Sequence, residues 1–113
     1  MSKLVVKNIV RQHAEMAAFL WTSYDRHLLK PDRDPETDTE EVADFIERLE
    51  AHLDGLRIAG DDGLRIAEDR YKEFPEAGEL FVLRMLAAKQ PIPVAELDLE
   101  KVRAYLGAHR PRN

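Results

Sequence analysis

The sequence predicts an all-α domain of about five helices, arranged as an antiparallel bundle or as a short helical stack. Two observations lead to this fold class. Apolar residues recur at helical spacing in five segments, and proline, glycine and aspartate separate those segments. The intervening loops are short, which makes sequential helices antiparallel neighbours. A length of 113 residues fits one domain, spanning residues 1–113.

Composition narrows the classes of protein to which the chain can belong. With 44% hydrophobic and 35% charged residues, it matches neither a disordered chain nor a membrane protein. The absence of cysteine excludes disulfides, thiol catalysis and cysteine-based zinc sites. The N-terminal residues show no signal-peptide pattern. We therefore expect a bacterial cytoplasmic protein that does not associate with membranes.

Charge is distributed unevenly along the chain. Residues 1–30 carry five basic and two acidic side chains, a net charge of +3, whereas residues 31–54 carry ten acids against Arg33 and Arg48, a net charge of −8. This distribution argues against nucleic acid as a ligand, because phosphate binding needs a basic footprint. The acidic segment is either an ordinary solvated helix face or a surface that attracts a basic protein.

The first helix is expected at residues 4–29. Its apolar residues form one broad stripe: Val5, Val6, Ile9, His13, Met16, Ala17, Leu20 and Tyr24. Trp21 extends this stripe, and Phe19 lies nearly opposite Trp21 on the helix. A helix with apolar residues on opposing sides is central in its fold or covered by a partner. Ala14, Ala17 and Ala18 would let another backbone approach closely.

The second helix, residues 40–59, follows an acidic, proline-containing loop at residues 31–39. Thr37, Asp38 or Thr39 can cap it, with Glu40 or Glu41 completing a capping box. Gly60 should end this helix, and Asp61 or Asp62 should cap the next one.

Three shorter helices are expected after Gly60. They cover about residues 62–73, 76–89 and 99–108. A proline-containing linker at residues 90–97 precedes the last helix, which Asp98 should cap, and a basic tail follows it.

No catalytic, cofactor-binding or metal-binding pattern is present in the sequence. It has no glycine-rich phosphate loop, no HExxH and no GxSxG. The histidines lack metal-ligand spacing within their own helices, because residues two apart point in nearly opposite directions. His13, on the apolar stripe, is interpreted as a hydrogen-bonded core histidine, with a ligand or general base as the alternative. We therefore predict a non-enzymatic protein without a cofactor.

A protein partner is the remaining functional expectation. Phe19 and Trp21 point in opposite directions, and a domain of this size has difficulty burying both, so one of them is expected to anchor a partner. The alternative is that both belong to the core. The candidate partner-binding residues are Phe19, Trp21, His13, Arg26, Glu41 and Asp44. The same surface could also form a homodimer.

Two runs of residues resemble a known family. They are Gln12-His13-Ala14-Glu15 with Ala17-Ala18-Phe19-Leu20-Trp21, and Glu50-Ala51-His52-Leu53-Asp54-Gly55-Leu56-Arg57. Residues 9–88 resemble the N-terminal helical module of a family of uncharacterised bacterial HEAT-repeat-like proteins linked to type VI secretion gene clusters. Longer members continue into repeats, whereas this sequence ends at Asn113.

The resemblance implies a HEAT-like helical module that binds a protein and has no enzymatic activity. It implies an accessory chaperone or co-chaperone that helps to load or deliver a type VI secretion effector. The alternative is an immunity protein that neutralises a cognate toxin, in which case the acidic residues 36–54 would form the interface.

Overall fold

The computed structural model describes residues 3–109, with side chains from residue 6 onward. Within this range the chain is all-α, as expected. The helices are α1 (Lys3–Leu28), α2 (Thr39–Ile58), α3 (Asp61–Glu73), α4 (Ala77–Ala87) and α5 (Leu99–Ala108). A short 3-10 helix, η1 (Val94–Glu96), lies within the linker before α5. The predicted basic tail from residue 110 onward lies outside the described residues.

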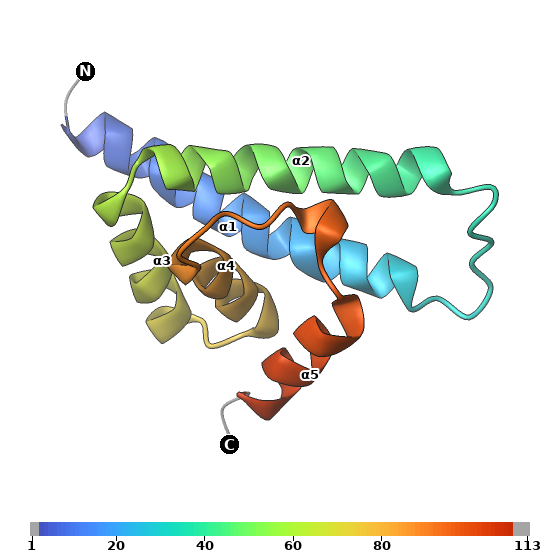
Figure 1. The fold of residues 1–113 in the computed structure, drawn as a ribbon. Helices are drawn as coiled ribbons and strands as arrows, with labels where there is room; N and C mark the ends of the chain where they lie inside the picture. Colours follow the sequence, from blue (N-terminus) through green and yellow to red (C-terminus); the bar gives the residue numbers. More distant parts are fainter. Residues whose placement is uncertain (1–2, 110–113) are drawn as a thin grey trace.

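Helix α1 is the centre of the arrangement. It packs against α2, α3 and α4, and α2 runs antiparallel to it, while α5 lies at the edge of the molecule (Figure 1). Three helices, α2, α3 and α4, thus pack around the same central helix. Of the two expected arrangements, bundle and short helical stack, the structure is therefore the bundle.

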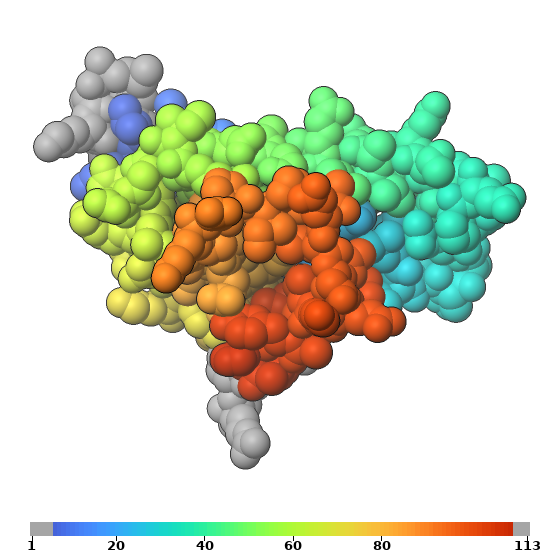
Figure 2. Space-filling view, viewed as in Figure 1, coloured from blue at the N-terminus to red at the C-terminus, as the bar shows by residue number. Residues whose placement is uncertain are grey.

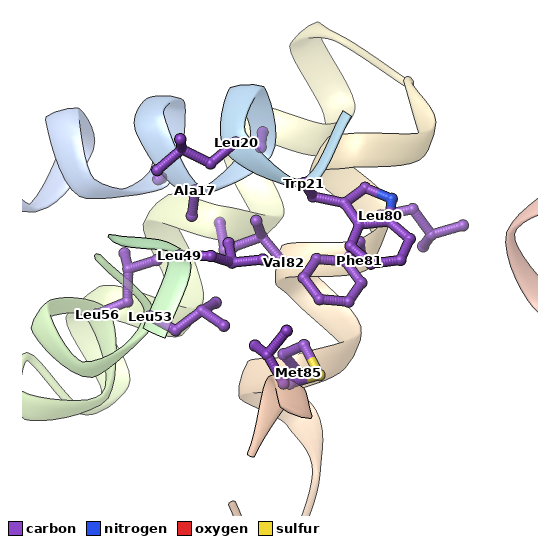
Figure 3. Close-up of a cluster of buried hydrophobic side chains, with 14 of the residues drawn as sticks. Ala17, Leu20, Trp21, Leu49, Leu53, Leu56, Leu80, Phe81, Val82 and Met85 are labelled. Carbon is purple, nitrogen blue, oxygen red and sulfur yellow. The ribbon is translucent and has the colours of Figure 1, made fainter. Parts of the chain in front are cut away.

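The core lies where one face of α1 meets α2 and α4. Figure 3 shows Trp21 of α1 lying against Phe81 of α4, while leucines of α2 and Val82 of α4 belong to the same buried cluster. The buried face of α1 follows Val10, Ala14, Ala17 and Trp21. The expected apolar stripe included Val6 and Ile9, but these side chains are 45% and 44% exposed. The face of α1 that is buried is therefore rotated away from them.

Small residues set the close contacts of α1. Ala14, Ala17 and Ala18 are all buried, as expected for a helix that other backbones approach closely. A Cβ on Gly78 of α4 would lie 2.5 Å from the carbonyl oxygen of Ala18. The absence of a side chain at residue 78 therefore allows α4 to lie against the backbone of α1.

Two of the expected helix caps are wrong. Asp38 occupies the N-cap position of α2 without capping it, because its carboxylate binds Arg33 and His27 instead. Gly60, rather than Asp61 or Asp62, is the N-cap of α3. Its φ of 60° lies in the left-handed region that glycine adopts readily, so the chain can leave α2 and enter α3 within a short turn. The Asp98 cap of α5 is confirmed, with its carboxylate accepting from the Lys101 N–H at 3.3 Å.

Candidate functional site

Phe19 and Trp21 have opposite environments. Trp21 is 2% exposed and its ring stacks on Phe81, with centroids 4.0 Å apart and planes 9° apart. Phe19 is 63% exposed, on the side of α1 that faces solvent. Trp21 is therefore part of the core and not of the surface, and Phe19 is the aromatic residue of the two that a partner can reach.

Phe19 belongs to a continuous row of exposed side chains near the C-terminal end of α1. We define the outer stripe as Phe19, Thr22, Arg26, Leu29 and Lys30, all of which are exposed. Their spacing of three, four and seven residues places them on one side of the helix and its extension. Leu29 is 60% exposed. Arg26 and Lys30 form no ion pair with any residue that the structure describes.

A shallow depression of about 460 Å³ lies beside the outer stripe. Its lining includes Thr22, Arg26, Leu29 and Lys30 from the stripe and Ala77 at the start of α4. The stripe therefore has a hollow beside it that can receive side chains of a partner.

The remaining candidate residues do not join Phe19 and Arg26 on this stripe. Glu41 and Asp44 lie on α2, where Asp44 pairs with Arg48 at 3.8 Å. His13 is half-buried between α1 and α2. The candidate residues thus lie in four places: Phe19 and Arg26 on the stripe, Glu41 and Asp44 on α2, His13 between α1 and α2, and Trp21 in the core.

His13 pairs with a histidine of the neighbouring helix. Its Nδ1 lies 2.9 Å from Nδ1 of His52, so one ring donates its Nδ1–H and the other accepts. The His13 ring occupies space beside Gly55, where a Cβ would lie 2.6 Å from it. His13 is therefore hydrogen-bonded, as interpreted, but it is half-buried between α1 and α2 and does not belong to the core. The partner could not be predicted from spacing along one helix, because His13 and His52 lie on different helices.

The histidine pair makes the stability of the fold depend on pH. Burial, followed by the charges of His13 and Arg48, lowers the pKa of His52 below its usual 6.5. The unfolded chain therefore binds a proton more readily at residue 52 than the folded chain does. The stabilising contribution is complete above pH 6.5 and is lost as the pH falls toward the lower folded pKa.

We expect wild-type protein to lose more unfolding free energy than His52→Gln between about pH 7.5 and about pH 5.5. One group contributes at most about 1.4 kcal/mol per pH unit. Urea denaturation at both pH values measures the difference, with His109→Gln, a change at an exposed histidine, as the matched control. Equal pH dependence in wild-type protein and His52→Gln would contradict the assignment.

A second polar cluster joins the end of α1 to the start of α2. His27 is buried, and its Nε2 lies 2.7 Å from Asp38 Oδ2, which also accepts from Arg33 Nε at 2.6 Å. The hydrogen bond from Arg33, more than that from His27, lowers the pKa of Asp38, although burial opposes it. The other ring nitrogen of His27, Nδ1, faces Glu41 Oε1 at 3.7 Å, so both ring nitrogens face carboxylates and neither faces a hydroxyl group. This cluster therefore fastens the 31–38 loop and lacks the order of groups that a catalytic triad needs.

Two other kinds of functional feature, a metal site and a membrane-spanning helix, are absent from the described residues. Between residues 3 and 109, no group of three or more histidine or acidic side chains is placed to hold a metal ion. No described helix combines the length and the apolar character needed to cross a membrane.

Comparison with known proteins returns no relative. No protein-family model, no curated protein and no solved structure matches the chain. The resemblance to the type VI secretion family stays a prediction from the sequence.

Proposed function

We propose that the protein is a non-enzymatic adaptor that binds another protein through the outer stripe of α1. The observation that carries this proposal is the exposure, at 63% and 60%, of Phe19 on α1 and of Leu29 directly after its end, on the same side. Single exposed apolar residues are common on protein surfaces. Here two large ones lie within three turns of each other.

The chemistry of the stripe suits a protein interface. Aromatic residues and arginine are enriched among the residues that dominate binding energy. Phe19 and Leu29 supply apolar area, and Arg26 and Lys30 supply charges that no described residue neutralises. The two acids of α1 are paired with other helices, since Glu15 binds Arg70 at 3.6 Å and Asp25 binds Arg103 at 2.6 Å. The stripe is therefore suited to a partner surface that is apolar with acidic residues around it.

For the identity of the partner, the family resemblance supports a cytoplasmic accessory chaperone or co-chaperone of a type VI secretion effector. In this role the outer stripe binds the effector or its chaperone before delivery. A homodimer through the same stripe is the competing arrangement.

An immunity protein is the second candidate, and the outer face of α2 favours it. Glu40, Asp44, Glu47 and Asp54 are all exposed on that side of the helix. Helix α2 lies along the surface of the molecule in Figure 2. Such a face would cover the basic cleft of a toxin.

Replacing Phe19 by glutamate tests the adaptor. Phe19→Glu replaces the aromatic residue of the stripe by a charge and should weaken binding to the effector or chaperone encoded beside this gene by about tenfold or more. Size-exclusion chromatography after co-expression, with affinity measured by calorimetry, reports the change. Ile58→Glu is the matched control, because Ile58 is 87% exposed on α2, outside the stripe.

The outcomes separate the roles. If Phe19→Glu binds the proteins encoded by neighbouring genes as tightly as wild-type protein does, the outer stripe is not the binding surface. Loss of the gene should abolish effector secretion without self-poisoning if the protein is an accessory chaperone. Self-poisoning, rescued by wild-type protein and not by a variant in which Glu40 and Glu47 become lysine, identifies the immunity role.

A further inference from the structure

A second hollow, separate from the outer stripe, lies between α4 and α5. We define the α4–α5 groove by Phe81, Met85, Ile92 and Val102, which give it a mostly apolar lining, together with Arg84 and Lys101. Its volume is about 240 Å³. Figure 2 looks onto this part of the molecule, with the linker and α5 in front of α4. No residue of α1 lines the groove.

The charged groups in this lining are of one sign. Arg84 and Lys101 line the groove, and no acidic side chain does. Neither cation forms an ion pair with any described residue. The Arg84 guanidinium lies 4.9 Å from the centre of the Tyr105 ring, which holds it beside the groove. The groove therefore combines an apolar lining with two cations that lack a carboxylate partner.

The size of the groove limits its occupant. A volume of about 240 Å³ lies below the range of about 300–1,000 Å³ that holds drug-sized ligands and cofactors. It suits one or two large apolar side chains. The main chain that carries them must cross the rim, where Ile92 is 44% exposed.

We propose that the α4–α5 groove binds an acidic amphipathic helix of a partner protein. Two large apolar side chains of that helix, spaced four residues apart, enter the groove between Ile92 and Val102. Its carboxylates meet Arg84 and Lys101. Charge complementarity selects this occupant over a basic or neutral helix. The proposal does not rest on the outer stripe, because the two surfaces share no residue.

The core provides a built-in reporter of occupancy. Phe81 lines the groove, and its ring stacks on Trp21, the one tryptophan of the chain, at 4.0 Å. A side chain that enters the groove changes the surroundings of Phe81 and hence those of the indole. Trp21 fluorescence should therefore report binding in unlabelled protein.

The test uses the full chain and a displayed library of random helical peptides, each about four turns long. Selection on wild-type protein is followed by removal of peptides that also bind Ile92→Glu. We expect enriched peptides to carry two large apolar residues at i and i+4 with flanking aspartate or glutamate. Their affinity, titrated by Trp21 fluorescence, should fall about tenfold or more in Lys101→Glu and stay unchanged in Ile58→Glu.

Each other outcome overturns the proposal. Enrichment of peptides without acidic residues would show that Arg84 and Lys101 do not select the occupant. Equal binding to wild-type protein, Ile92→Glu and Lys101→Glu would show that the peptides do not bind in the groove. Binding of decanoate without enrichment of any peptide identifies a fatty-acid site. Self-association in sedimentation that Ile92→Glu abolishes identifies a second copy of the chain as the occupant. Lys101 is exposed, so its variant keeps the test valid if Ile92→Glu does not fold.

Discussion

Replacing Trp21 by alanine should lower the free energy of unfolding by about 3–5 kcal/mol. Trp21 is 2% exposed, stacks on Phe81, and meets the edge of the Tyr24 ring with centroids 6.1 Å apart. Truncation removes these contacts and leaves a cavity where α1 meets α4 (Figure 3). Domains of this size have about 5–15 kcal/mol of stability, so the variant should be largely unfolded at elevated temperature.

The matched control is the other aromatic residue of α1. Phe19→Ala removes a side chain that is 63% exposed, so its effect on unfolding should stay within about 0.5 kcal/mol. Urea denaturation of both variants measures the contrast. A large loss in Phe19→Ala, or a small one in Trp21→Ala, would show that the two environments have been assigned the wrong way round.

The helices could be predicted from the sequence because their apolar periodicity is local. Helix α5 begins and ends at the expected residues, and α1 and α2 differ from expectation by one residue at each end. The caps were harder to predict, because they depend on competing partners. Asp38 could cap α2, yet Arg33 and His27 offer its carboxylate stronger, charge-assisted hydrogen bonds.

The burial of Trp21 rather than Phe19 depends on residues distant in sequence. Periodicity placed the two rings on opposite sides of α1 but did not state which side α4 would cover. That side is set by contacts with α4, among them the stacking of Trp21 on Phe81 and the close approach of Gly78 to Ala18. The pairing of His13 with His52 likewise joins residues 39 positions apart, and it requires the antiparallel register of α1 and α2.

The candidate surfaces show the same division between local and long-range information. Phe19 and Arg26 share a helix side, so the sequence could place both on one surface. The α4–α5 groove was not predicted, because α4, the linker and α5 contribute separate parts of its lining. Residues 90–97 were expected to act only as a linker. In the structure, the buried Val94 of η1 and the backbone N–H that it donates to Glu50 hold this segment against α2.

Gly63→Ala should also be strongly destabilising, by about 3 kcal/mol, at the upper end of the cost of overpacking. Gly63 is buried in the first turn of α3, and an added Cβ would collide with the carbonyl oxygen of Leu56 on α2. Because that oxygen belongs to the backbone, relief requires α3 to move away from α2.

Gly107→Ala is the control for this substitution. Outside the local backbone of α5, no atom lies within 4 Å of a Cβ added at Gly107, so alanine there should be neutral or stabilise the protein by up to about 1 kcal/mol. Thermal and urea denaturation of the two variants measure the difference. Since α3 and α4 pack against each other, Gly63→Ala should also change the amide chemical shifts of α4, whereas Gly107→Ala should leave those of α3 unchanged. Similar stability of the two variants would contradict the close packing of α3 against α2.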